Sequence, residues 1–327
     1  MSTTSIAASK VLDRVLVLEM VRVTEAAAIS AAKLIGRGDE KAADAAAVEA
    51  MRAAFNELEF DGTVVIGEGE RDEAPMLYIG EKVGTGRGPK IDIALDPLEG
   101  TTITAKAGPN ALAVLAIAED GCLLNAPDVY MDKIAIGPGY PKGLVSLDKS
   151  ATENIQALAK AKGVKPHEIT ALILDRPRHE KIISGVRSTG AAVQLITDGD
   201  VAGVIATSDP ATGIDIYMGQ GGAPEGVLAA AALRCVGGQI QTRLVFRKDD
   251  ERRRAEKLGI TDFNRKYSLM DLASGDVVFS ATGVTNGSML KGVQVTREHI
   301  FTESIVMRSA TGTVRWIRAR HRRRDVG

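Results

Sequence analysis

Two carboxylates, Asp96 and Glu99, stand three residues apart in the segment Asp-Pro-Leu-Glu-Gly-Thr-Thr (96–102). The apolar run 91–95 precedes them and indicates a buried strand, so both acids follow a strand end. Carboxylate oxygens suit Mg²⁺ or Mn²⁺, which commonly combine few carboxylates with the oxygens of a substrate phosphate. Gly100 offers backbone N–H access for that phosphate. By itself, the segment also fits an ordinary Asp-Pro turn leading into a helix.

Three further acids, Asp44, Glu68 and Glu225, stand beside glycines or at the ends of expected elements. Each alone fits a solvated helix acid, a charged turn or a favourable helix start. Clustered carboxylates, however, raise one another's pKa and stay ionised in a cleft only with cations. Two or three divalent ions would make such a cluster a phosphoryl-transfer site with a metal-activated water. Thr101 can position or deprotonate that water, or it can cap a helix.

The helices and strands expected around these residues predict an α/β (α+β) fold in two lobes. A Gly/Pro-rich stretch at 137–143 marks the linker between an N-terminal metal lobe (1–140) and a C-terminal sugar-phosphate lobe (141–327). A hairpin-like turn is expected at 120–121, leading into 122–124, and a glycine loop at 219–222. Helices are expected at 11–35, 41–58, 152–162, 180–189, 201–206 and 225–235. Strands are expected at 63–66, 91–95, 111–118, 133–136, 171–174, 193–196 and 214–218, with late strands at 276–280, 304–308 and 313–317 that can return to the first lobe.

The amino-acid composition argues against several classes of protein. The 327 residues are 45% hydrophobic and 25% charged, and the formal net charge is −1. This balance gives no global drive toward nucleic acid or an anionic membrane. Cys122 and Cys235 are too few for a disulfide framework and are expected to be buried and reduced. The N-terminus lacks a continuous apolar segment, and no run of eighteen apolar residues follows, so a cytoplasmic protein is expected.

Two other classes compete with an enzyme that uses metal ions. The basic stretch 315–324 carries one aromatic residue and suits a nucleic-acid-binding module, although the rest of the chain offsets its charge. A solvated tail or an oligomer contact explains it better. A dinucleotide-binding oxidoreductase is weaker, because the glycines at 67–69 and 219–222 do not complete the G-x-G-x-x-G pattern.

Several longer strings carry a resemblance over about residues 19–317. They are Val-Ile-Gly-Glu-Gly-Glu (65–70), Glu-Ala-Pro-Met-Leu-Tyr-Ile-Gly-Glu-Lys-Val-Gly (73–84), Asp-Pro-Leu-Glu-Gly-Thr (96–101), Asn-Ala-Pro-Asp-Val-Tyr-Met (125–131), Arg-Pro-Arg-His (176–179), Asp-Gly-Asp (198–200), Gly-Gly-Ala-Pro-Glu-Gly (221–226) and Phe-Ser-Ala-Thr-Gly-Val-Thr (279–285). With them the chain resembles the class II fructose-1,6-bisphosphatases of the GlpX type, which belong to the metal-dependent, lithium-sensitive sugar and inositol phosphatases.

The resemblance implies an αβαβα layered fold and Mn²⁺- or Mg²⁺-dependent hydrolysis of the 1-phosphate of fructose 1,6-bisphosphate. Thr101 and Asp44 would be catalytic. Metal ligands would be Asp44, Glu68, Asp96, Glu99 and Glu225. Substrate would be held by Glu99, Gly100, Thr101, Tyr130, Arg176, Pro177, Arg178, Asp198, Gly199, Asp200 and Gly222. The expected partner is a small sugar bisphosphate, without nucleic acid or membrane, and the chain is expected to form a homo-oligomer, either a dimer or a tetramer.

The chain departs from the family pattern at Glu40, where a lysine usually stands four residues before the helix aspartate; here Lys41 follows one place later. It also lacks a long insertion after 81–84 that is associated with sedoheptulose-1,7-bisphosphate activity, which favours fructose bisphosphate. The open alternatives are a dual fructose/sedoheptulose bisphosphatase and an inositol or nucleotide phosphatase of the same superfamily. The paired arginines argue against the latter, since a second phosphate needs cationic partners.

Overall fold

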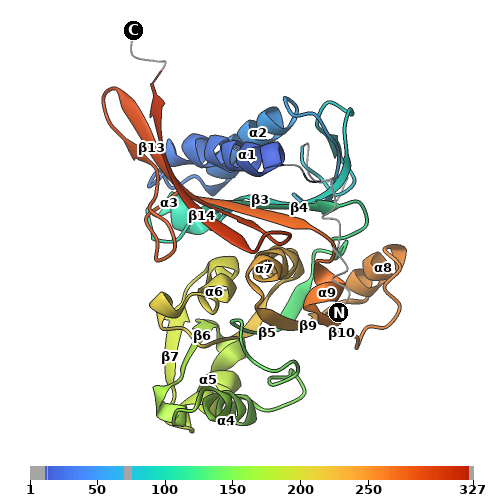
Figure 1. Ribbon diagram of the computed structural model, residues 1–327, viewed down its shortest axis with the longest axis vertical. Coiled ribbons are helices and arrows are strands. Elements are labelled where there is room, and N and C mark those ends of the chain that lie inside the picture. The colour runs from blue at the N-terminus through green and yellow to red at the C-terminus, as the bar shows by residue number, and fades with distance from the viewer. Residues whose placement is uncertain (1–11, 13, 70–75, 324–327) are drawn as a thin grey trace, which may run out of the picture.

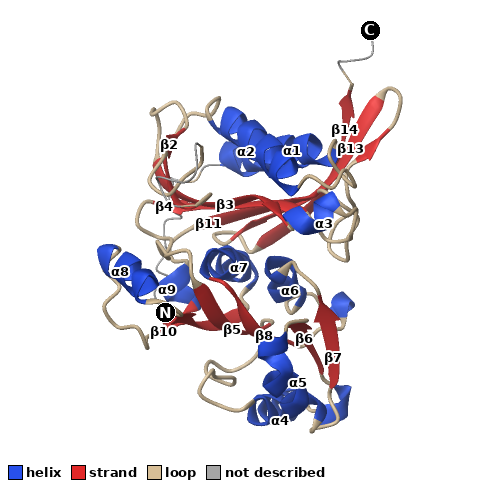
Figure 2. Ribbon diagram, turned by 180° about the vertical axis from the view of Figure 1, so that it is seen from behind, coloured by secondary structure: helices blue, strands red, loops and turns tan. Residues whose placement is uncertain are grey.

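The structure is a computed structural model that describes residue 12, residues 14–69 and residues 76–323. Its elements form five layers in the order helices, sheet, helices, sheet, helices (Figure 1). Figure 2 shows the same layers from behind, with α6 (Asp200–Ala206) and α7 (Ala223–Val236) between the two sheets. The layered α/β architecture predicted from the sequence is confirmed.

The first sheet joins the beginning of the chain to its end, because the late strands lie beside the early ones. Its neighbouring strands pair antiparallel, apart from the parallel pair β1 and β3. In the described part of the chain its eight strands are, in order, β12 (Gln294–Val295), β13 (His299–Arg308), β11 (Val277–Gly283), β4 (Leu112–Glu119), β3 (Lys90–Glu99), β1 (Asp61–Ile66) and β2 (Lys82–Val83), with β14 (Thr313–Arg322) paired to β13.

Helices α1 (Arg14–Ala32) and α2 (Glu40–Phe55) cover the outer face of the first sheet (Figure 1). Their apolar sides are buried against the central strands. Helix α2 begins where the Asp39 side chain accepts a hydrogen bond from the backbone N–H of Ala42, at 2.9 Å. Both predicted N-terminal helices are thus present, with slightly different ends.

The second sheet forms the core of the lower half in Figure 1, and α4 (Ala151–Lys162) and α5 (Glu180–Arg187) cover its outer face. The other short elements are α3 (Thr101–Ala105), α8 (Asp249–Lys257), α9 (Leu269–Leu272) and the 3₁₀ turns η1 (Pro166–Glu168), η2 (Pro177–His179) and η3 (Pro210–Thr212). Among the described residues the six strands of this sheet are, in order, β10 (Lys266–Ser268), β9 (Gln239–Val245), β5 (Tyr130–Ile136), β8 (Ile216–Gly222), β6 (Thr170–Leu174) and β7 (Ala192–Ile196).

Helix α7 is the main packing element between the sheets. Alanine, leucine and valine occupy nearly all its sides and are buried, which is the pattern of a helix with neighbours on both faces. Because alanine side chains are small, the two sheets approach it closely. Its first turn therefore lies fixed at the junction between the two halves.

The chain passes from the first sheet to the second between β4 and β5. Strand β5 is therefore already part of the second sheet, whereas β11, β13 and β14 return to the first. The division near residue 140 that the Gly/Pro-rich stretch indicated stays a prediction. No helix in the described ranges is long and apolar enough to cross a membrane.

Three local expectations were wrong. Segment 122–124 does not return along β4: Leu123 bridges Ala273, since its apolar side chain packs between the sheets. Segment 219–222 is not a loop but the end of β8, paired with β5. The basic stretch is no solvated tail, because residues 313–322 form β14 along the full length of β13. Both cysteines are free, with Cys235 buried and Cys122 only half-buried.

Candidate active site

The first two predicted metal ligands lie at the irregular end of β3. The strand runs through Glu99 instead of ending before Asp96, and its register with β4 shifts between these two residues. Asp96 Oδ1 accepts the backbone N–H of Leu98 at 3.0 Å. Gly100 then adopts φ 93°, which favours glycine, and α3 begins at Thr101. The shifted register turns both carboxylates toward the layer that contains α7.

Glu99 connects the first sheet to the helix layer. Its carboxylate is buried, and its Oε1 accepts the backbone N–H of Val201, in the first turn of α6, at 3.0 Å. Its Oε2 has no hydrogen-bond partner, and the same holds for the buried Oε2 of Glu225 in the first turn of α7. Carboxylate oxygens without partners are costly in a buried place. They are therefore positions where a cation or a donor from a ligand fits.

The glycines at the end of β8 make room for these acids. A Cβ on Gly221 would lie 2.0 Å from Asp200 Oδ2, and a Cβ on Gly222 would lie 1.9 Å from Glu225 Oε2. Side chains on these residues would therefore displace the carboxylates. The glycine run that looked like a loop in the sequence is a strand whose bare backbone forms one wall of the site.

Burial dominates the electrostatics of the acids. It raises the pKa of Glu68 to about 7, and the charges of Asp44 and Asp128 add to that rise. It raises the pKa of Glu225 to about 7 as well, where Asp200 adds to the rise and Lys133 opposes it.

For Asp96, burial raises the pKa well above its usual range, and Glu68, Glu225 and Asp44 raise it further. Burial also raises the pKa of Glu99 well above its usual range, and the charges of Asp200, Asp96 and Glu225 raise it further. These mutual effects show that the five predicted metal ligands form one cluster, in which Asp44 of α2 is half-buried and has a pKa raised by burial.

Lys133 and Asp128 belong to this neighbourhood and were missed from the sequence. Lys133 of β5 is fully buried, and its Nζ lies 2.5 Å from Asp200 Oδ2. A lysine directly before the apolar run 134–136 was the available signal, because a buried ammonium requires a carboxylate partner. Asp200, predicted to bind sugar, thus already holds a cation of the protein itself.

The predicted residues for the sugar and the distal phosphate lie at the adjoining ends of β5, β6 and β8. Arg178 donates from Nε and Nη2 to the Gln220 carbonyl at 3.2 and 2.6 Å, and its Cζ lies 5.0 Å from the centroid of the Tyr130 ring. Arg176 precedes the exposed Pro177, which starts η2. Gln220 was missed by the sequence reasoning, which regarded its segment as a loop.

Asp198 and Gly199 complete the predicted set at the start of α6. Gly199 adopts φ 87° and donates its N–H to Asp198 Oδ1 at 3.1 Å. Burial raises the pKa of Asp198 and Asp200 adds to the rise, whereas Arg176 lowers it. Both residues line a cavity of about 250 Å³ between α6, β6, β7 and the segments 109–110 and 286–288.

The carboxylates of the five predicted metal ligands suit divalent cations, both by the kind of donor atom and by charge. The cluster offers hard oxygen donors, two of them buried without partners, and desolvation opposes ionisation unless positive charge is supplied. Within the described ranges, no three His, Cys, Asp or Glu side chains form a ready-made metal cage.

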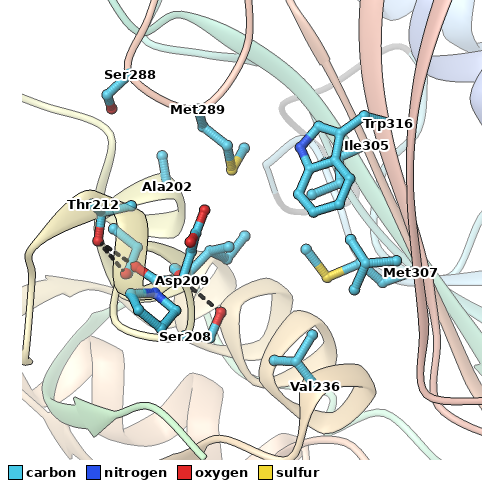
Figure 3. A pocket seen from close by; sticks show the side chains of 14 residues that line it. Ala202, Ser208, Asp209, Thr212, Val236, Ser288, Met289, Ile305, Met307 and Trp316 are labelled. Atoms are coloured by element: carbon cyan, nitrogen blue, oxygen red, sulfur yellow. Dashed lines mark hydrogen bonds between the residues drawn. The ribbon is translucent and has the colours of Figure 1, made fainter.

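A second cavity, of about 210 Å³, lies between α6, α7 and the strands β13 and β14, and it shares Ala202, Ala206 and Ser288 with the first (Figure 3). Its walls are largely apolar, with Met289, Met307 and Trp316 facing the space. The predicted site residues are absent from its lining. It is therefore separate from the carboxylate cluster.

A desolvated carboxylate cluster within a five-layered α/β fold is the arrangement expected of a metal-dependent phosphatase. The family described as bacterial fructose-1,6-bisphosphatase, glpX-encoded, matches residues 14–321. Fructose-1,6-bisphosphatase 1 class 2 of Escherichia coli strain K12 is 46% identical over 322 residues, covering 94% of this chain and 95% of that protein. Fructose-1,6-bisphosphatase class 2 of Shigella flexneri has the same identity and coverage. The chain belongs to the glpX-encoded bacterial fructose-1,6-bisphosphatase family, which confirms the family predicted from the motifs.

Proposed function

We propose that this protein hydrolyses the 1-phosphate of fructose 1,6-bisphosphate with the help of divalent metal ions, releasing fructose 6-phosphate and phosphate. The observation that carries the proposal is the cluster of the half-buried Asp96 and Glu225 with the buried Glu99, in which two buried carboxylate oxygens are left without partners. The 46% identity to a fructose-1,6-bisphosphatase over nearly the whole chain supports the choice of substrate.

In this proposal the carboxylates of Asp44, Glu68, Asp96, Glu99 and Glu225 hold Mn²⁺ or Mg²⁺. Such ions, when bound, supply an activated water and neutralise charge on the phosphoryl group. The protein contributes ligands from β3, α2, α7 and the segment that follows β1, which belong to different layers. Because each carboxylate is desolvated, its affinity for a cation exceeds that of an exposed acid.

Thr101 and Asp44 act on the attacking water. Thr101 begins α3 directly after Gly100, two residues beyond Glu99 at the end of β3. The hydroxyl orients the water, and the Asp44 carboxylate accepts its proton. The backbone N–H groups of Gly100 and Thr101 point out of the helix start and bind oxygens of the scissile phosphate.

The far end of the substrate lies against β5 and β8. Tyr130, Arg176 and Arg178 face the distal phosphate, with the backbone of Pro177 beside them. The sugar hydroxyls meet Asp198, Gly199 and Gly222, together with the oxygen of Asp200 that Lys133 does not hold. An arginine fork matches phosphate oxygens, and carboxylates accept hydrogen bonds from hydroxyls.

Phosphate release from fructose 1,6-bisphosphate, measured with Mn²⁺ and with a chelator, tests the proposal. We expect metal-dependent release that exceeds release from sedoheptulose 1,7-bisphosphate and from inositol monophosphate in parallel assays. Preferential hydrolysis of inositol monophosphate would assign the chain to another activity, and release unaffected by the chelator would contradict the role of the carboxylates. Light scattering after gel filtration tests the expected dimer or tetramer.

A further inference from the structure

Arg247 lies where the proposed function needs a cation but was not among the predicted site residues. It follows β9 in the connection to α8, and its Cζ lies 3.7 Å from the centroid of the Tyr130 ring. Arg178 approaches the same ring at 5.0 Å. Tyr130 thus has two guanidinium groups against it, each at a distance where the ring attracts a cation.

Sheet pairing explains why Arg247 reaches this place. Tyr130 begins β5, the strand between β8 and β9, and pairs with Gly222 on one side and with Val245 on the other. Arg247 follows Val245 by two residues. The tyrosine therefore lies between the glycine wall of the site and the strand end that delivers Arg247, and β9 joins the site through its C-terminal end.

Gln220 connects the two arginines. Its backbone carbonyl accepts both bonds from Arg178, and its side-chain Oε1 accepts Arg247 Nη2 at 2.9 Å. The other end of the amide donates to Asp132 Oδ1 at 3.0 Å, which orients Oε1 toward the arginine. The backbone N–H of Gln220 donates to His179 Nε2 at 2.8 Å. One residue of β8 thus sets the positions of both guanidinium groups.

Arg176, Arg178 and Arg247 bring three positive charges to this end of the site. None of the ion pairs among the described residues involves Arg176, Arg178 or Arg247. Partial burial lowers the pKa of Arg178, and the charges of Arg176 and Arg247 lower it further, while Tyr130 opposes them. Asp198 compensates only part of this charge, through Arg176, so the three like charges favour binding of a dianion.

We propose that Arg247 is a third arginine of the distal-phosphate subsite and that it sets the preference for sugar substrates with a phosphate at both ends. This rests on the proposed function of the same site. Arg178 and Arg247 then bind the phosphate with the N–H groups that their bonds to Gln220 leave free, Tyr130 supports both through its ring face, and Gln220 holds their spacing. Arg247 binds a group remote from the reacting atoms, so it affects substrate affinity more than the chemical step.

The test compares Arg247→Ala with the matched control Arg253→Ala, an exposed arginine of α8 paired with Asp250. Both variants are assayed with Mn²⁺ on fructose 1,6-bisphosphate and on fructose 1-phosphate, which lacks the distal phosphate. We expect Arg247→Ala to raise KM for the bisphosphate by about 10- to 100-fold. The ratio of kcat/KM between the two substrates should fall by a similar factor. Arg253→Ala should behave as the native protein, and Arg247→Lys should restore part of the affinity, since lysine lacks the fork.

A binding measurement distinguishes the role of Arg247 from the proposed hydrolysis. Titration calorimetry with fructose 6-phosphate, which carries only the distal phosphate, should show weaker binding to Mn²⁺-loaded Arg247→Ala by about tenfold or more. Equal losses on both substrates, or unchanged fructose 6-phosphate binding, would overturn the role of Arg247. A native protein that binds fructose 6-phosphate through Arg247 but releases no phosphate from the bisphosphate would instead contradict the proposed reaction.

Discussion

The carboxylate cluster and the arginine cluster lie on opposite ends of one proposed substrate, and they differ in burial. Burial raises the pKa of Asp96, Glu99 and Glu225, and their charges raise one another's pKa further, which favours either a bound proton or a bound cation. Arg178 and Arg247 are exposed, and water screens their repulsion. The buried cluster is therefore suited to chemistry that changes with metal and pH, whereas the exposed cluster is suited to binding and orientation.

The largest effect should come from Thr101, beside the carboxylate cluster. Thr101→Ala should lower kcat by about 10²- to 10⁴-fold, because the hydroxyl that orients the water is lost. The Mn²⁺ activation curve and the thermal midpoint should stay close to those of the native protein. Turnover within a few-fold of native would remove Thr101 from the mechanism.

The buried acids should control metal dependence. Asp96→Asn should shift the Mn²⁺ concentration for half-maximal activity upward by about tenfold or more, because an amide is a weaker ligand than a carboxylate. The same substitution removes a desolvated charge, so the metal-free protein should melt at a higher temperature. Calorimetry in EDTA checks the second expectation, and an unchanged activation curve would contradict the first.

The arginine cluster should act on KM with little change in kcat. Arg178→Gln should raise KM for fructose 1,6-bisphosphate by about tenfold, because one charged contact with the distal phosphate is lost. Steady-state kinetics at two salt concentrations measure this, and the variant should show a weaker salt dependence of KM than the native protein. A fall in kcat equal to that of Thr101→Ala would erase the distinction between the clusters.

Metal-free stability should fall as pH rises from about 5 to about 7. The pKa values of Glu68 and Glu225 are raised to about 7 from 4.5, so the native state keeps protons that the unfolded chain has released. Their contribution to the free energy of unfolding is complete below the pKa of the unfolded chain. It is lost as the pH rises through the pKa of the folded protein. Urea midpoints in EDTA measure the fall. Excess Mn²⁺ should remove it, and Glu225→Gln should reduce it; a midpoint that rises with pH in EDTA would contradict the burial of these acids.

The smallest effect should come from Glu40, the departure from the family pattern. Its side chain is exposed in the first turn of α2, one turn before Asp44. Glu40→Lys should change kcat/KM by no more than about twofold, because an exposed charge pair at this spacing contributes little. A change of tenfold or more would show that this position contacts the substrate or a metal.

The secondary-structure elements that depend on local sequence could be predicted. The apolar run 91–95 and the early helices follow from periodicity and composition, and each is present in the structure. Segment 122–124 was misassigned because Leu123 pairs with Ala273, about 150 residues away, and local turn chemistry carries no information about that partner. The glycines at 219–222 were misassigned for a related reason: they pair along β5, although glycine favours loops.

The candidate residues for chemistry could be predicted from the sequence alone, because acids beside glycines and the family strings are local features. Which charges meet depends on the tertiary structure. Lys133 reaches Asp200 because β5 lies beside β8, and Arg247 reaches Tyr130 because β9 lies on the other side of β5. Desolvation is likewise a property of packed layers, so the raised pKa of Glu99 and its unpartnered oxygen arise only when α6 and α7 close over the end of β3.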